Sequence, residues 1–268
     1  MSVFVINHCT VTPVRQEPSE GSEQLTQLLF SEVCEVLDRL PRLTKIRSTV
    51  DGQEGWVDFK MLSPAPVSLQ EVRGEGVVAT PLAIATEMET GEELMLTLGT
   101  RLPNYAHGTF EVLGRQYIID PDCVSSMEAT GLLGGKAKGE DVCTVAQTLL
   151  NAPYLWGGKN AMGMDCSGFT QVVYSVFGVN LLRNAREQMT QGTFIASLED
   201  AQPGDLAFFD HADRDPKATN ISHVGLLLDN KKIIHCSGCV HVDDIDEMGI
   251  HLPDGELTHH LVQIKRYL

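Results

Sequence analysis

The stretch Met164-Asp165-Cys166-Ser167-Gly168-Phe169 decides how the rest of this chain is interpreted. Its cysteine follows a glycine-containing loop over 157–164 and precedes an apolar run with helical spacing that begins near Ser167. A cysteine nucleophile reacts as its thiolate, and a free thiol has a pKa of about 8.5. A helix N-terminus and a partner imidazole both lower that pKa. We therefore expect Cys166 to be a nucleophile whose thiol has a lowered pKa.

The alternative for any single cysteine is a buried, inert, small hydrophobic residue. This interpretation does not fit Cys166, because the polar residues Asp165 and Ser167 flank this cysteine and a glycine loop precedes it. The chain has 7 cysteines, an odd number that favours a reducing compartment over a disulfide scaffold. The C-x-x-C pair Cys236-Ser237-Gly238-Cys239 has no second pair at metal-ligand spacing, so we interpret it as incidental. The inert alternative suits the cysteines in or beside apolar runs: Cys9, Cys34, Cys123 and Cys143.

Two histidines are placed to supply a base. His223 begins the apolar run 224–228, and His235 ends the run 232–235. The short polar segment 229–231 joins the two runs, which predicts an antiparallel hairpin. Its geometry puts both histidines near the same end of that hairpin.

A base acts well only when a third group fixes its tautomer and orientation. We therefore assign Cys166 as nucleophile, His223 as base and His235 as orienter, in a mechanism that needs no metal or organic cofactor. The alternative is a zinc site made from His223, His235 and either Cys236 or Asp210. No H-E-x-x-H motif or paired C-x-x-C supports that alternative.

Charge and hydropathy exclude other classes of function. The 20 Lys and Arg residues face 36 Asp and Glu residues, giving a net charge of -16. Nucleic-acid backbones are held mainly by Lys and Arg, so we expect no nucleic-acid partner. No apolar stretch approaches the roughly 18–20 residues that span a bilayer, and no signal-peptide pattern starts the chain. We expect a cytoplasmic protein without membrane contact, and a signal-trimmed secreted form is the alternative.

The pattern of apolar residues and turn signals divides the chain into three successive segments. Residues 1–65 hold short apolar runs separated by turn signals, which is typical of a small β-barrel. Residues 66–135 repeat this pattern weakly at a nearly constant offset, which predicts a second barrel. Residues 136–268 carry helical spacing over 141–151 and 167–177 and then strand-like runs, an α+β pattern.

Five ordered motifs stand in the last segment: Tyr154-Leu155-Trp156-Gly157-Gly158, Asp165-Cys166-Ser167-Gly168-Phe169, Gln202-Pro203-Gly204-Asp205-Leu206, Ser222-His223-Val224-Gly225 and Ile234-His235-Cys236-Ser237-Gly238. Together they resemble the catalytic domain of NlpC-type peptidases, a papain-like superfamily that acts on bacterial cell-wall peptides. The resemblance covers about residues 138–268. It implies a papain-like domain in which helices pack on an antiparallel sheet.

The front of the chain extends this resemblance. Two bacterial Src-homology-3-like barrels before such a domain resemble the arrangement of γ-D-glutamyl-L-diamino acid endopeptidases. The resemblance implies a thiol protease that hydrolyses murein peptides such as L-Ala-γ-D-Glu-meso-diaminopimelate. The missing signal favours a role in cell-wall recycling, and wall remodelling is the alternative. In members with such barrels, the first barrel closes one end of the cleft and selects a free N-terminal L-Ala. The alternatives are a papain-like amidase or acyltransferase on another amide, and a non-catalytic cell-wall peptide binding protein.

Site residues are carried over on matching positions. The resemblance implies that Trp156 forms a cleft wall and that Asp165 and Ser167 contact the substrate. The nucleophile's own backbone N–H is expected to help bind the oxyanion. A free ammonium group needs a carboxylate on the first barrel. Glu23 is the first candidate and Asp58 the second, and the alternative for each is a solvated surface acid.

One run departs from the family pattern. Relatives often carry Arg-Asp, then serines and then Gln, whereas this chain has Arg183-Asn184-Ala185-Arg186-Glu187-Gln188. The arginine and the glutamine remain, but the hydroxyl groups are replaced. The resemblance therefore leaves the preferred diamino acid open, and it says nothing about protein partners or oligomeric state.

Overall fold

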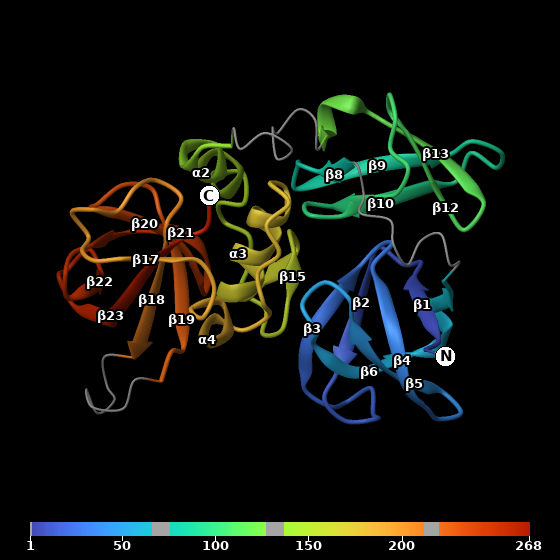
Figure 1. Cartoon of the computed structure of the whole chain (residues 1–268), viewed down its shortest axis with the longest axis horizontal. Helices are drawn as coiled ribbons and strands as arrows, with labels where there is room; N and C mark the ends of the chain where they lie inside the picture. Colours follow the sequence, from blue (N-terminus) through green and yellow to red (C-terminus); the bar gives the residue numbers. More distant parts are fainter. Residues whose placement is uncertain (1, 66–75, 127–136, 212–219) are drawn as a thin grey trace. The chain divides into compact units, whose positions relative to one another are not determined.

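The computed structural model describes residues 2–65, 76–126, 137–211 and 220–268 (Figure 1). The chain forms two compact units. The first comprises Met1–Leu133 with Trp156–Ala161, and the second comprises Gly134–Leu155 with Met162–Leu268. The predicted domain boundaries, after residues 65 and 135, adjoin or fall within segments outside the described residues, and they stay predictions.

The first unit begins with a seven-stranded sheet in the order β3-β2-β6-β5-β4-β1-β7. Side chains alternate between the two faces of a strand, so the side chain of every second residue points into a core of small and branched apolar groups. That core includes Val14, Leu28 and Ile46, all fully buried. The strands and one 3-10 turn are β1 (Phe4–Asn7), β2 (Val11–Arg15), β3 (Gln24–Leu29), β4 (Val33–Arg39), β5 (Leu43–Ser48), β6 (Glu54–Asp58), η1 (Phe59–Met61) and β7 (Leu62–Pro64).

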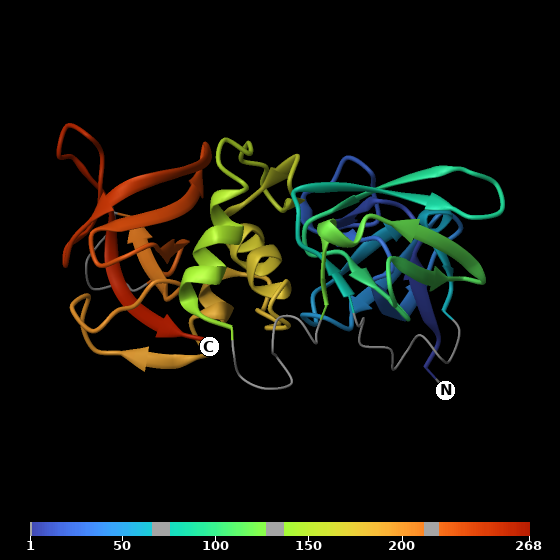
Figure 2. The ribbon, with the colours of Figure 1, turned by 90° about the horizontal axis from the view of Figure 1, so that it is seen from above.

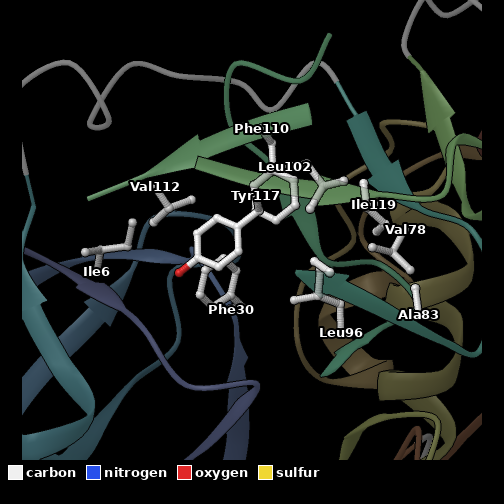
Figure 3. Packing of buried hydrophobic residues seen from close by; sticks show 11 residues of the cluster. Ile6, Phe30, Val78, Ala83, Leu96, Leu102, Phe110, Val112, Tyr117 and Ile119 are labelled. Carbon is white, nitrogen blue, oxygen red and sulfur yellow. The ribbon is translucent and has the colours of Figure 1, made fainter. Parts of the chain in front are cut away.

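Two smaller sheets follow in the same unit, one four-stranded in the order β10-β9-β13-β12 and one three-stranded in the order β11-β8-β14. Phe110 and Tyr117 stack at 5.0 Å between ring centroids, and Phe30 meets Tyr117 edge-on at 6.1 Å (Figure 3). Ile6 joins the same cluster, so side chains from the first sheet complete this core. The elements are β8 (Gly76–Val78), β9 (Leu82–Glu87), β10 (Glu93–Thr97), β11 (Arg101–Leu102), β12 (Thr109–Val112), β13 (Arg115–Ile119), η2 (Pro121–Cys123) and β14 (Val124–Ser126).

The second unit is built on a seven-stranded antiparallel sheet in the order β17-β23-β18-β19-β20-β21-β22. A further pairing of β22 with β23 closes most of it on itself around apolar side chains such as Phe209, Ile233 and Ile264. The strands of this sheet are β17 (Thr193–Ile195), β18 (Leu206–His211), β19 (His223–Leu227), β20 (Lys232–Ser237), β21 (Cys239–Ile245), β22 (Gly249–His251) and β23 (Leu257–Arg266). The short strand β16 (Gly163–Met164) lies in the same unit outside this sheet, whereas β15 (Lys159–Asn160) belongs to the first unit.

In the described part of the second unit, three helices accompany this sheet: α2 (Gly139–Gln147), α3 (Cys166–Ser175) and α4 (Ala185–Gln188). α3 packs against β19, β20 and α2 (Figure 2). The prediction of an α+β domain with helices packed on an antiparallel sheet, preceded by small β-barrels, is therefore confirmed. Within the described ranges, no helix has the length and apolar character needed to cross a membrane.

The ends of α3 follow from its sequence. Asp165 is the N-cap, and its Oδ1 accepts a hydrogen bond from the backbone N–H of Gly168 at 2.7 Å. At the other end Gly178 adopts a φ of 71°, and the N–H groups of Gly178 and Val179 bond to the carbonyls of Ser175 and Tyr174. This C-terminal motif needs a residue that tolerates the left-handed region. The helix therefore starts at Cys166 and ends at Ser175, shortly before the glycine.

Candidate active site

Cys166 is the first residue of α3, where unpaired backbone N–H groups gather. Its thiol is buried, and it interacts with the backbone N–H of Val224 at the start of β19, beside His223. Burial raises the pKa of the Cys166 thiol to about 12, the Asp165 carboxylate adds to this rise, and the Val224 N–H opposes it. The expectation of a lowered pKa is thus corrected, because burial outweighs the helix N-terminus. The resting thiol is neutral and needs a base to remove its proton.

His223 and His235 lie together on neighbouring strands. β19 and β20 pair antiparallel, with Gly225 opposite His235. Nε2 of His223 lies 2.8 Å from Nδ1 of His235, and both side chains are buried. The contact leaves Nδ1 of His223 as the nitrogen that does not face His235. The structure therefore brings the predicted base and the predicted orienter into direct hydrogen-bonding contact.

Asp243 on β21 extends this pair. Its Oδ2 lies 3.1 Å from Nε2 of His235. The hydrogen bond from His235 lowers the pKa of Asp243, whereas burial is the largest cause that lowers the pKa of His235. Near neutral pH we therefore treat Asp243 as a carboxylate and His235 as a neutral imidazole.

These protonation states fix the tautomer of each ring. An ionised carboxylate only accepts hydrogen bonds, so Nε2 of His235 carries the proton and donates to Asp243. Nδ1 of the neutral His235 ring then has a lone pair, and it accepts from Nε2–H of His223. Nδ1 of His223 is consequently unprotonated, which is the form that can accept a proton from the Cys166 thiol.

Asp243 was missed by the sequence reasoning. A signal does exist, because His241 and Asp243 alternate along β21 and so share a face of the strand. His241 lies opposite His235 in the register, and its Nε2 is also 3.1 Å from Oδ2 of Asp243. That face could be recognised only by knowing which strand pairs with the strand of His235.

Asp165 and Ser167 have partners inside the protein. Arg183 binds both carboxylate oxygens of Asp165, at 3.0 and 2.6 Å, and donates to Oγ of Ser167 at 2.9 Å. The Arg183 side chain is fully buried. Gln188 donates to the Ser167 carbonyl at 3.0 Å. Arg183 and Gln188 therefore hold the first turn of α3, and a substrate role for Asp165 and Ser167 stays a prediction.

Trp156 and Glu23 meet within the first unit. The indole Nε1–H of Trp156 donates to Oε1 of Glu23 at 2.8 Å, and the Trp156 carbonyl accepts from the side chain of Gln24 at 3.1 Å. Trp156 is 62% exposed, so most of its ring remains available as a surface. Asp58 instead caps η1, where its Oδ1 accepts from the backbone N–H of Lys60 at 2.9 Å. Of the two candidate acids, Glu23 is the one placed beside Trp156.

The segment after Trp156 is anchored in the same unit by buried polar contacts. Nζ of Lys159 lies 2.8 Å from Oε1 of Glu32, with both side chains buried. The backbone N–H of Lys159 and the side-chain amide of Asn160 both donate to Oε1 of Gln27 at 2.8 Å. Sequence reasoning gave no sign of this anchor, because its partners are far apart in the chain.

In the part of the chain that it describes, the structure does not bring together the ligands of the zinc site that was the alternative from sequence. The thiol of Cys236 donates to the Met164 carbonyl at 3.2 Å, and Oδ2 of Asp210 accepts from the backbone N–H of Asn220 at 3.1 Å. Among the residues that the structure describes, the group with metal-ligand geometry contains neither of them nor His223. It consists of His235, His241 and Asp243.

Comparisons with known proteins identify the family. The sequence model of the NlpC/P60 family matches residues 151–261. A γ-D-glutamyl-L-lysine dipeptidyl-peptidase of Bacillus subtilis (strain 168) is 30% identical over 223 residues, which span 78% of this chain and 71% of that protein. The chain belongs to the NlpC/P60 family. The resemblance based on the five motifs is thereby confirmed.

Further relatives agree with this assignment. A γ-D-glutamyl-L-lysine dipeptidyl-peptidase of Bacillus cereus (strain ATCC 10987 / NRS 248) is 26% identical over 225 residues, spanning 78% of this chain and 66% of that protein. The crystal structure of an NlpC/P60 family protein from Bacillus cereus ATCC 10987 has a TM-score of 0.82 at 19% identity, over 99% of both chains. At that identity the structural likeness establishes the fold. Family membership makes this NlpC/P60 chain a cysteine peptidase.

Proposed function

We propose that this NlpC/P60 peptidase hydrolyses the bond between the γ-carboxyl group of D-glutamate and a diamino acid in murein peptides such as L-Ala-γ-D-Glu-meso-diaminopimelate. The observation that carries the proposal is the contact between His223 and His235, next to a cysteine at a helix start. The two Bacillus relatives are γ-D-glutamyl-L-lysine dipeptidyl-peptidases, which supports this substrate class.

The reaction is acyl transfer through a thioester. Sγ of Cys166 gives its proton to Nδ1 of His223 and attacks the γ-carbonyl carbon. The tetrahedral intermediate collapses, the C–N bond breaks, and His223 returns the proton to the leaving amine. A water molecule then gives a proton to His223, attacks the thioester and releases L-Ala-D-Glu, and His223 reprotonates the thiolate. No metal or organic cofactor takes part in any of these steps.

The developing oxyanion needs donors that are already in place. The backbone N–H of Cys166 is unpaired within α3, because it belongs to the first turn of the helix. The helix dipole adds partial positive charge at the same point. Both features favour an anionic intermediate at the position where the nucleophile attacks. Arg183 keeps this turn fixed through its bonds to Asp165 and Ser167.

Glu23 is the proposed binding group for the free amine of L-Ala. One of its oxygens is held by the Trp156 indole, which orients the carboxylate without neutralising its charge. The second oxygen of a carboxylate held in this way can accept a hydrogen bond from an ammonium group. This role would restrict the enzyme to peptides with an unblocked N-terminus, and it would make a dipeptide the released acyl group.

Such a restriction suits released wall fragments rather than chains still attached to glycan. We therefore propose that the enzyme acts in recycling of wall peptides in the cytoplasm. Cell fractionation with an antibody against the chain tests this location. Detection of the protein only in the wall or medium fraction would contradict it.

The function is tested by incubating the full chain with L-Ala-γ-D-Glu-meso-diaminopimelate and identifying the products by mass spectrometry. We expect L-Ala-D-Glu and free diaminopimelate, whereas an acyltransferase would form a new amide. The matching peptide with L-lysine tests which diamino acid is preferred, and an α-linked isomer is the control for the γ-linkage. Equal cleavage of the α-linked and γ-linked peptides would contradict the proposal.

A further inference from the structure

His235, His241 and Asp243 form a compact set of ligand atoms on β20 and β21. One ligand atom from each residue lies within 4.8 Å of the others. Nε2 of His235 and Nε2 of His241 are each 3.1 Å from Oδ2 of Asp243. Two imidazole nitrogens and a carboxylate oxygen are a ligand set that suits Zn²⁺, with water in a fourth position.

The hydrogen bonds of His241 orient its ring toward Asp243. Nδ1 of His241 lies 2.8 Å from the backbone carbonyl of Cys239, which can only accept, so Nδ1 carries a proton and donates to that carbonyl. The other ring nitrogen, Nε2, faces Oδ2 of Asp243 at 3.1 Å. Both atoms therefore lie where one ion would meet the two histidines and the carboxylate.

The outer hydrogen bonds also match those of metal sites. A histidine that binds a metal commonly donates its other ring N–H to a backbone carbonyl or another acceptor, which fixes the ring. His241 has such a partner in the Cys239 carbonyl. Nδ1 of His235 faces Nε2 of His223, which becomes such an acceptor once the proton between the two rings moves to His235. The side chain of His241 is 33% exposed, so an ion can reach the set from solvent.

We propose that His235, His241 and Asp243 form a divalent-metal site, best suited to Zn²⁺, and that an ion bound there inhibits the peptidase. The binding follows from the geometry of the three ligands. The inhibition rests in addition on the proposed function, in which His223 is the base and His235 its orienter.

Inhibition follows from the tautomers of the two rings. The ion takes the lone pair on Nε2 of His235, and the proton held there leaves to solvent. The proton on Nε2 of His223 moves to Nδ1 of His235, and a solvent proton then occupies Nδ1 of His223. Each ring still carries one proton, but Nδ1 of His223 no longer has a lone pair. His223 can then take a proton neither from Cys166 nor from the hydrolytic water.

Binding is tested by calorimetric titration of Zn²⁺ into the full-length C166A protein after treatment with EDTA, because this variant cannot bind the ion through the catalytic thiol. We expect a site whose affinity falls at least about tenfold in C166A/H241F, since loss of even an outer partner of a metal site has effects of 10–100-fold. H260F is the matched control, because His260 is a half-buried strand residue of the same sheet outside the set. H241Q serves as a second variant should the phenylalanine disturb folding.

Two results of the titration overturn the site. One is the absence of Zn²⁺ binding to C166A. The other is equal Zn²⁺ affinity with and without His241, which places the ion elsewhere, for example on Cys236 and Cys239.

Inhibition is tested with the wild-type enzyme and the murein tripeptide, each rate being divided by the same variant's rate in EDTA. We expect Zn²⁺ to inhibit reversibly and H241F to require at least about tenfold more Zn²⁺ for half-inhibition, with H260F unchanged. Zn²⁺ binding at His241 without any inhibition overturns the regulatory claim. A wild-type protein that cleaves nothing in EDTA contradicts the proposed function instead, and the titration still decides the site.

Discussion

Nε2 of His223 lies 2.8 Å from Nδ1 of His235, and this contact sets which nitrogen of His223 can act as a base. Asp243 fixes the direction of the proton at the far end, because a carboxylate only accepts. His223, His235 and Asp243 therefore form one hydrogen-bonded series. Cys166 lies beside its first member, because the thiol interacts with the backbone N–H of Val224.

Asp243→Asn is expected to impair catalysis more than Asp243→Ala. The new amide can donate to Nε2 of His235, which would move the proton of that ring to Nδ1 and leave His223 in the wrong tautomer. We expect kcat to fall about 10²-fold with KM nearly unchanged, measured by steady-state kinetics on the γ-linked peptide. Asp243→Glu, which keeps the charge, should restore part of the rate. Full activity of Asp243→Asn would show that the carboxylate does not set the tautomer.

The raised pKa of Cys166 predicts how its thiol responds to pH when its base is removed. In His223→Ala, the rate of Cys166 alkylation by iodoacetamide should rise about tenfold per pH unit up to pH ~10 without levelling off, because only the thiolate reacts. The direction follows from burial, which raises the pKa to about 12. Peptide mass spectrometry separates Cys166 from the other cysteines, and circular dichroism checks the fold at each pH. A plateau near pH ~8.5 would mean that the site instead favours the thiolate.

Arg183 is expected to be essential for stability. Arg183→Met leaves the carboxylate of Asp165 buried without its partner, a loss of about 3–5 kcal/mol in the free energy of unfolding. Lys232→Met, which breaks the exposed pair with Asp244, is the matched control and should lower it by at most about 1 kcal/mol. Urea unfolding of each variant measures both values.

The cause of that loss can be tested separately. Adding Asp165→Asn to Arg183→Met removes the unpaired charge, so the double variant should recover part of the stability. A double variant as unstable as the sum of the two single changes would contradict this explanation.

Glu23→Gln tests capture of the substrate amine. Glutamine still accepts the Trp156 indole hydrogen bond, so the change removes the charge with little effect on packing. We expect kcat/KM for the free-amine peptide to fall about 10- to 100-fold, since a hydrogen bond to a charged group contributes roughly 1.5–3 kcal/mol. Asp58→Asn separates the two candidate acids. A loss in Asp58→Asn with full activity in Glu23→Gln would assign the role to Asp58.

The catalytic motif and the type of fold could be predicted from sequence because both depend on local patterns. The helix that begins at Cys166 is marked by Asp165 before it and Gly178 after it, and the histidine hairpin by two apolar runs joined by a tight polar turn. These signals act over a few residues, where propensity and turn chemistry are informative.

The remaining features depend on contacts between distant segments. Asp243 acts only because β21 pairs beside β20, and Arg183 reaches Asp165 only after the chain has folded back. The direction of the Cys166 pKa was mispredicted for a related reason. The helix N-terminus is visible in the sequence, whereas the burial that outweighs it is a property of the folded protein.

In the proposed reaction, Cys166 carries the acyl group of the γ-D-glutamyl bond. Its most direct test is mass spectrometry of the intact protein, quenched in acid during turnover of L-Ala-γ-D-Glu-meso-diaminopimelate and then digested. We predict a mass increase equal to the L-Ala-D-Glu acyl group on the peptide that contains Cys166, and neither adduct nor cleavage with Cys166→Ala. An adduct on another residue, or equal cleavage by Cys166→Ala, would contradict the claim.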